Sequence, residues 1–148
     1  PAIVSWPAGI AGGRVVDEVG AGMDIVPTVL EAAGIDAGAY ELDGKSVLPM
    51  LAEGAASPHD AVYWELADQT AVRRGRWKLV VQGRLVEHES APVELHLADL
   101  DDDPGETVNL ADEYPEIARD LRAAAHAWRE AIEGRWASYW GADAPVTV

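Results

Sequence analysis

Short runs of alternating apolar and polar residues occupy the middle of the chain, from residue 61 to residue 100. They are rich in β-branched and aromatic residues and are separated by links of a few residues, several of which contain Gly or Pro. The runs cover residues 61–66, 70–74, 77–81, 85–88 and 93–100. Because links this short can join only antiparallel neighbours, the pattern predicts a four- to five-stranded antiparallel sheet.

One side of this sheet is expected to be apolar. In the last run Val93, Leu95 and Leu97 alternate with residues that face the other way, among them His96 and Ala98. This alternation is typical of a sheet with one packed face and one face in water. An apolar element must therefore cover the packed face.

A period of 3.6 residues follows the sheet and supplies that cover. After Pro115, which suits the first turn of a helix, apolar residues recur at spacings of three or four. They are Ile117, Leu121, Ala125, Trp128 and Ile132. The sequence predicts a helix that packs on the sheet and stops at Gly134, with a tail over residues 137–148.

The first 58 residues have a different pattern. Residues 2–6 form an apolar run that predicts a short buried strand, closed by Pro7 and a Gly-rich stretch. Asp24 is expected to cap a helix that Gly34 ends, with apolar positions at Ile25, Val26, Val29, Leu30 and Ala33. Ser46 is expected to cap a short helix that Gly54 ends.

The composition limits the partners. The chain has 11 basic and 26 acidic residues and a net charge of −15, which disfavours nucleic acid and anionic membrane surfaces. No apolar stretch approaches the length of a membrane span. With no cysteine there is no disulfide, thiolate nucleophile or Cys-based zinc site. The abrupt apolar start, without an initiator Met, resembles a cut through a larger protein.

The most acidic run, residues 100–116, does not complete an EF-hand calcium loop that begins at Asp99. Asp99, Asp101 and Asp103 fit the first three ligand positions, but Pro104 and Leu110 replace the required Gly and Glu. The run is therefore interpreted as a turn after a strand, with later acids near a helix N-terminus.

Other candidate motifs are incomplete. The run Gly44-Lys45-Ser46 lacks the first glycine of a P-loop, because Ala39 occupies that position. The four histidines, His59, His88, His96 and His126, have no metal-ligand spacing and are expected at the surface or the rim of the core.

Aromatic and basic residues share two neighbouring strands, around Trp64 and between Arg73 and Lys78. One interpretation is a core Trp with basic side chains in solvent. The other is a platform for a sugar or an aryl ester built on Trp64.

The order of several short motifs resembles the C-terminal part of the sulfatase family, which is arylsulfatase-like and belongs to the alkaline phosphatase superfamily. The motifs are Ile3-Val4-Ser5-Trp6-Pro7, Met23-Asp24-Ile25-Val26-Pro27-Thr28 with Ala33-Gly34-Ile35, Asp43-Gly44-Lys45-Ser46 to Leu51, Tyr63-Trp64-Glu65, Ala71-Val72-Arg73 with Gly75-Arg76-Trp77-Lys78-Leu79-Val80, and Leu97-Ala98-Asp99-Leu100 to Asn109-Leu110-Ala111. The resemblance extends from residue 2 to about residue 133. Ala98 and Arg76 depart from the residues that the family usually carries there.

The resemblance implies an α/β fold, which is α+β within this chain. Residues 1–58 would be the end of the large α/β domain, with residues 2–6 as one of its strands. Residues 59–136 would be the smaller subdomain of antiparallel sheet and C-terminal helix, and residues 137–148 a tail.

The family's catalytic residues have no counterpart here. A Cys/Ser-x-Pro-x-Arg segment, whose first residue becomes formylglycine, and Asp/Asn ligands for calcium are expected in the upstream part of a full-length parent. No catalytic or metal residue is therefore assigned to this chain, which alone is expected to be inactive. Trp64 and Glu65 are the predicted substrate-binding residues, because they end a strand before a loop.

The sequence thus favours the C-terminal part of a sulfatase that completes the fold and borders the substrate cleft, with the catalytic N-terminal part as its partner. One alternative is a binding or self-association module that pairs through an exposed strand and helix. Another is the same part of a phosphodiester or phosphonate ester hydrolase.

Overall fold

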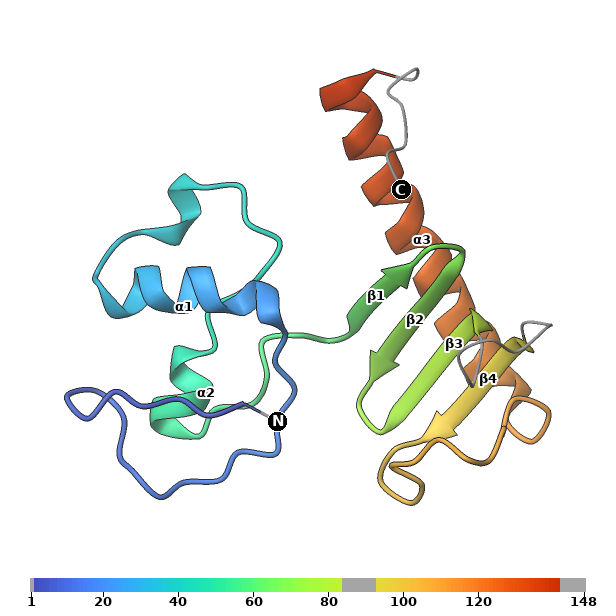
Figure 1. The fold of residues 1–148 in the computed structure, drawn as a ribbon, viewed down its shortest axis with the longest axis horizontal. Coiled ribbons are helices and arrows are strands. Elements are labelled where there is room, and N and C mark those ends of the chain that lie inside the picture. The colour runs from blue at the N-terminus through green and yellow to red at the C-terminus, as the bar shows by residue number, and fades with distance from the viewer. Residues whose placement is uncertain (1, 84–92, 142–148) are drawn as a thin grey trace. The chain divides into compact units, whose positions relative to one another are not determined.

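The computed structural model describes residues 2–83 and 93–141, and the chain divides into two compact units, Pro1–Asp60 and Ala61–Val148 (Figure 1). The predicted strand at residues 85–88 lies outside the described residues.

The second unit contains the predicted antiparallel sheet. Its strands are β1 (Val62–Leu66), β2 (Gln69–Arg74), β3 (Trp77–Gly83) and β4 (Val93–Asp99), in the order β1-β2-β3-β4. Each strand pairs antiparallel with the next. The prediction of a four- to five-stranded antiparallel sheet is confirmed, with four strands in the described residues.

The helix α3 (Pro115–Trp140) covers one face of this sheet, as predicted (Figure 1). The buried core between them consists of Val72, Leu79, Val81, Leu97, Ala118, Leu121 and Ala125. At its edge the rings of Tyr63 and Trp128 stack with 5.3 Å between centroids and 5° between planes. Burial of these apolar side chains is the main term that holds helix and sheet together.

The helix does not stop at Gly134, where the sequence predicted its end. It continues to Trp140, and the residue in the left-handed region that follows it is Gly141, with φ of 77°. Gly134 costs about 1 kcal/mol relative to Ala inside a helix, which good helix formers on either side can offset. The extension exposes Trp136, Tyr139 and Trp140.

The sheet face opposite α3 is less exposed than the alternation predicted. His96 and Ala98 were expected to face water, but they are 1% and 0% exposed. The segment after β4 folds back along this strand, and Leu110 N donates to Leu97 O at 2.8 Å.

The first unit contains α1 (Ile25–Ala32) and α2 (Leu48–Glu53), with short 3-10 turns at Gly22–Asp24 and Ala37–Ala39. Gly34 ends α1 as predicted, with φ of 72° and the paired bonds Gly34 N to Glu31 O and Ile35 N to Leu30 O, both 2.9 Å. Gly54, with φ of 76°, ends α2.

The predicted strand at residues 2–6 is wrong for the chain as it stands. In the part of the chain that the structure describes, these residues pair with no other segment. A strand needs a neighbour that satisfies its backbone N–H and C=O groups, and apolar character alone does not provide one.

The apolar face predicted for α1 is also turned outward. Ile25, Val26 and Val29 are 65%, 53% and 60% exposed, whereas Asp24 and Pro27 are buried. The reason lies in the side chain that was expected to cap the helix.

Asp24 is a buried hydrogen-bonding centre, and its side chain does not cap α1. Its carboxylate accepts hydrogen bonds from Ala21 N at 2.7 Å and from Lys45 N at 2.9 Å. It also contacts His59 Nε2 at 2.8 and 2.9 Å. The side chains of Asp24 and His59 are 2% and 4% exposed, although His59 as a whole residue is only half-buried, in keeping with its predicted position at the rim. The prediction of a surface or rim position is wrong for His96, which is buried.

Two further contacts tie this centre to α2. Thr28 Oγ1 donates to Asp24 O at 2.6 Å and accepts from Val47 N at 3.0 Å. Gly44 lies so close to the Met23 carbonyl that a Cβ there would collide with it. The turn at residues 43–46 therefore fixes the side of α1 that faces inward.

We expect Asp24→Asn to lower the free energy of unfolding of the first unit by about 3 kcal/mol at pH 7, because a buried pair loses one partner. Burial raises the pKa of Asp24, but the Ala21 and Lys45 amides and His59 outweigh that effect, so this pKa lies below its ordinary value. The carboxylate therefore stabilises the fold above the unfolded-state pKa of about 4 and loses this effect as the pH falls through the folded-state pKa.

Calorimetric unfolding at several pH values would check this expectation, with the exposed Asp17→Asn as the control. The difference between wild type and Asp24→Asn should shrink below about pH 4. A difference that stays constant in acid would contradict the role given to the carboxylate.

The link between β1 and β2 offers a second prediction. Ala67 has φ of 55°, which costs a residue with a Cβ about 1 kcal/mol. Ala67→Gly should therefore raise the free energy of unfolding of the second unit by about 0.5–1 kcal/mol. Urea titration would measure the change, and Ala123→Gly on the exposed side of α3 should act in the opposite sense.

Candidate functional site

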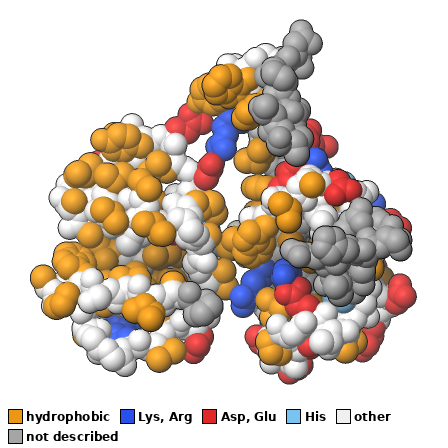
Figure 2. Space-filling model, in the orientation of Figure 1, with side chains coloured by type: hydrophobic (Ala, Val, Ile, Leu, Met, Phe, Trp, Pro, Cys, Tyr) orange, Lys and Arg blue, Asp and Glu red, His pale blue; other side chains and the backbone are white. Residues whose placement is uncertain are grey.

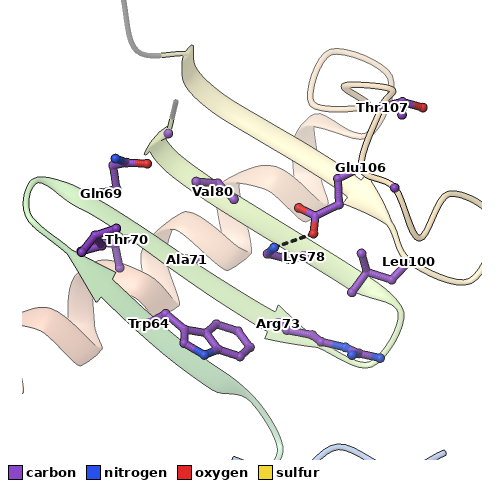
Figure 3. A pocket seen from close by; sticks show the side chains of 13 residues that line it. Trp64, Gln69, Thr70, Ala71, Arg73, Lys78, Val80, Leu100, Glu106 and Thr107 are labelled. Atoms are coloured by element: carbon purple, nitrogen blue, oxygen red, sulfur yellow. Dashed lines mark hydrogen bonds and ion pairs between the residues drawn. The ribbon is translucent and has the colours of Figure 1, made fainter. Parts of the chain in front are cut away.

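An open hollow of about 870 Å³ lies on the sheet face opposite α3 (Figure 3). Strands β1, β2 and β3 form its floor, and the segment after β4 forms one wall. Its polar and aromatic lining residues include Trp64, Gln69, Arg73, Lys78, Glu106 and Thr107.

The strand register brings three of these residues onto one face. Trp64 pairs with Ala71 across β1 and β2, and Arg73 pairs with Lys78 across β2 and β3. Since alternate residues of a strand share a face, Trp64, Arg73 and Lys78 all lie in the hollow. Trp64 is 45% exposed, and its cross-strand neighbour Ala71 has only a small side chain.

Glu106 reaches the hollow from the segment after β4. Its carboxylate pairs with Lys78 Nζ at 2.6 Å, as Figure 3 shows. Its carbonyl oxygen accepts a hydrogen bond from His96 Nε2 at 3.0 Å. His96 Nδ1 is buried and has no hydrogen-bond partner among the described residues.

Glu106 is also one of the few residues with a side chain in the left-handed region, with φ of 54°. Its backbone N donates to Asp103 O at 3.1 Å, which adds to the contacts with Lys78 and His96. Strained backbone of this kind persists only where the surroundings hold it. Glu106 is therefore held by two contacts to its backbone and by one contact to its carboxylate.

Asp103 organises the turn that carries Glu106. Its carboxylate accepts from Thr107 N at 2.7 Å and from Val108 N at 2.9 Å. The bond from Val108 N contributes most to a lowered pKa of Asp103. The acidic run is thus a hydrogen-bonded turn, in agreement with its interpretation from the sequence.

Asn109 joins this turn to the sheet. Its side-chain oxygen accepts from Leu97 N at 3.1 Å, and its side-chain nitrogen donates to Leu95 O at 2.9 Å. The amide group of Asn109 therefore replaces a peptide group of a neighbouring strand along β4. This pairing holds the wall of the hollow against the sheet.

The remaining acids of the run surround Arg76. Asp99 and Asp102 both pair with its guanidinium, and Asp101 lies 3.8 Å away. The hydrogen bond from Arg76 holds the pKa of Asp99 below its ordinary value despite desolvation.

Arg73 has no carboxylate at ion-pair distance within the part of the chain that the structure describes. Its Nε donates to Gly75 O at 3.0 Å. Two cations, Arg73 and Lys78, and one carboxylate, Glu106, line the hollow. The hollow therefore has a local excess of positive charge, although the whole chain has a net charge of −15.

The two predicted substrate-binding residues fall on opposite faces. Trp64 lines the hollow, whereas the Glu65 carboxylate lies 3.2 Å from Arg129 NH2 of α3. In the sequence, Arg73 and Lys78 are recognisable only as part of a basic pattern, and Glu106 was not predicted as a site residue. The two-residue link Gly75-Arg76 is the signal that could have placed Arg73 opposite Lys78.

A metal or modified nucleophile of the kind that the resemblance implies does not fit these residues. Among the described residues, no group of three or more His, Asp and Glu side chains could hold a metal ion. The sequence contains no Cys and no Ser-x-Pro-x-Arg segment. Residues 2–83 and 93–141 also contain no helix with the length and apolar character of a membrane span.

Comparison with known proteins decides the family. The sequence model of the family described as "N-sulphoglucosamine sulphohydrolase, C-terminal" matches residues 1–131. The chain belongs to this family. The resemblance to the C-terminal part of the sulfatases is thereby confirmed.

Two relatives illustrate the extent of the match. Arylsulfatase A of Bos taurus is 33% identical over 144 residues, which cover 84% of this chain and 28% of that protein. Arylsulfatase K of Mus musculus is 32% identical over 134 residues, which cover 82% of this chain and 23% of that protein. The sulfatase C-terminal chain spans about a quarter of the length of these relatives.

Solved structures share the fold. One of them, described as being in complex with its substrate D-glucosamine-2-N,6-O-disulfate, matches with a TM-score of 0.63 and 19% identity. The match covers 84% of this chain and 27% of that chain. The predicted fold, an antiparallel sheet with a packed C-terminal helix in a sulfatase C-terminal region, is confirmed.

Asn109→Asp tests the contact that holds the wall of the hollow. The variant keeps the oxygen that Leu97 N requires but replaces the donor to Leu95 O with a second, repelling oxygen. We expect the free energy of unfolding of the second unit to fall by about 1–3 kcal/mol.

Hydrogen exchange should locate the effect. Repulsion from Leu95 O displaces the new carboxylate from β4, so the Leu97 amide should exchange faster than in the wild type, whereas the amides in the middle of β2 should change less. The exposed Asp112→Asn provides a neighbouring control without this contact. Unchanged exchange at Leu97 would show that the Asn109 side chain does not hold β4.

Proposed function

We propose that this chain is the C-terminal part of a sulfatase, a sulfuric ester hydrolase, in which it completes the fold and borders the substrate cleft. The observation that carries the proposal is the family match over residues 1–131 in a chain about a quarter as long as its relatives. The catalytic nucleophile, as formylglycine, and a calcium ion would belong to the N-terminal part.

The exposed surface of the first unit supports a role in completing a larger fold. Figure 2 shows hydrophobic side chains spread over the visible face of this unit. On and beside α1 the large exposed ones include Met23, Ile25, Val26, Val29 and Ile35. Apolar surface of this extent marks a contact with another protein surface, and we propose that the catalytic N-terminal part covers it.

The same surface favours self-association as a second candidate when the chain is alone. Residues 2–6 pair with no segment in the described part of the chain, and Ile3 is 98% exposed. Exposed apolar residues without a partner segment can contact a second copy in the same way as they contact another protein.

Trp64 and Glu65 remain the proposed residues at the substrate cleft. The half-exposed ring of Trp64 in the hollow is available to a ligand, whereas Glu65 is positioned at the same strand end by Arg129. The division of the chain into residues 1–58, 59–136 and 137–148 is likewise retained as a proposal.

For the substrate we propose a sulfated amino sugar. The family description names N-sulphoglucosamine, and one solved neighbour is described with a disulfated glucosamine as its substrate. Relatives named arylsulfatase make an aryl sulfate the competing choice.

Intact mass and N-terminal sequencing of the protein from its native source, together with a hydrolysis assay, test this proposal. We expect a much longer chain with a Cys/Ser-x-Pro-x-Arg segment that releases sulfate from N- or O-sulfated glucosamine. The 148-residue chain alone should release none. A native protein that begins near Pro1, or a full-length protein inactive on every sulfate ester, would reject the proposed function.

A further inference from the structure

We propose that the hollow over β1, β2 and β3 binds an anionic group of the substrate that is not hydrolysed, with Arg73 and Lys78 holding the anion and Trp64 packing on the sugar ring. This inference rests on the proposed function and identifies a second recognition site in its substrate class. A disulfated sugar presents one anion that reacts and one that does not, and the second also needs a counter-charge.

The dimensions of the hollow suit such a ligand. Its volume of about 870 Å³ lies within the roughly 300–1,000 Å³ of small-molecule sites. Apolar residues, among them Ala71, Val80 and Leu100, line it together with a few polar groups. One or two sugar rings fit this space.

The charge of the hollow favours an oxyanion. Arg73 and Lys78 are direct cross-strand neighbours, and like charges at this spacing repel each other unless an anion lies between them. Glu106 offsets only one of the two positive charges. The planar guanidinium of Arg73, with N–H groups beyond the one bonded to Gly75 O, matches two oxygens of a sulfate or carboxylate.

The aromatic ring supplies the apolar part of the site. Trp64 lies beside Arg73 and across from Lys78 in Figure 3. Trp64 is 45% exposed, so it is not part of the buried core of this unit. An exposed indole beside cations is suited to the C–H face of a sugar that carries an acidic group.

The site is also built to be rigid. Lys78 is held by Glu106, and Glu106 is held in the left-handed region by its contacts with Asp103 and His96. Side chains that are fixed before a ligand arrives lose less entropy on binding. This arrangement explains why a strained residue occupies the wall of the hollow.

Calorimetric titration of the 148-residue chain tests the inference directly. The probes are a heparin-derived disaccharide with several sulfates and its fully desulfated counterpart, in buffer of low ionic strength. We expect the sulfated probe to bind and the desulfated probe to bind at least tenfold more weakly, and added salt to reduce the difference.

Variants then locate the binding. Arg73→Gln should weaken binding of the sulfated probe roughly tenfold, which corresponds to about 1.4 kcal/mol. Trp64→Leu should weaken binding of both probes roughly fivefold. Matched controls are Arg122→Gln and Trp136→Leu on α3, which alter an exposed Arg and an exposed Trp outside the hollow and should change binding less than twofold.

The inference is overturned if the chain does not distinguish the two probes, or if Arg73→Gln and Arg122→Gln have the same effect.

In the full-length protein, Arg73→Gln should raise KM for a disulfated substrate and leave KM for a monosulfated one unchanged. An equal change for both would also reject it. If the sulfated probe binds to the hollow but the full-length protein hydrolyses no sulfate ester, the proposed function is rejected and the binding site is retained. If the full-length protein hydrolyses the ester but the probe does not bind to the hollow, the binding site is rejected and the proposed function is retained.

Discussion

The period of two along the antiparallel strands determines what each side of the second unit can do. Val72, Leu79 and Leu97 face α3, so the residues between them must face the hollow. Because Arg73 and Lys78 alternate with core residues, a shift of one residue in register would bury both cations and remove the hollow. The apolar core and the candidate binding site are therefore specified by the same pairing. The pairing that builds the core of this unit therefore also determines the positions of the side chains that line the hollow.

The first unit depends on a polar interaction instead. The buried carboxylate of Asp24 receives hydrogen bonds from residues 21, 45 and 59, which are far apart in the sequence. The first unit has few buried apolar side chains, and Met50 is one of them. A single charged group thus sets the orientation of α1 and directs Ile25, Val26 and Val29 outward. This arrangement is consistent with a unit whose remaining apolar contacts are made with another part of a larger protein.

Local patterns in the sequence were sufficient for the sheet, the covering helix and the glycine that ends α1, because each depends on neighbours within a few residues. The role of Asp24 could not be predicted, since an Asp before an apolar helix is usually a cap and two of its partners here, Lys45 and His59, are distant in the sequence. The end of α3 was misplaced because a glycine alone does not stop a helix between good helix formers. Residues 2–6 have strand composition but no partner in the described residues. The hollow was only partly predictable: Trp64 was identified, but its proximity to Glu106 depends on the path of the segment after β4.

The side chain of Asn109 has a consequence for solubility. By occupying the N–H of Leu97 and the carbonyl of Leu95, it closes part of the outer edge of the sheet, where a strand of another molecule could otherwise add. The chain thus carries its own protection against edge-to-edge aggregation of this unit. The motif that positions one wall of the hollow therefore also blocks part of an edge at which a second sheet could pair.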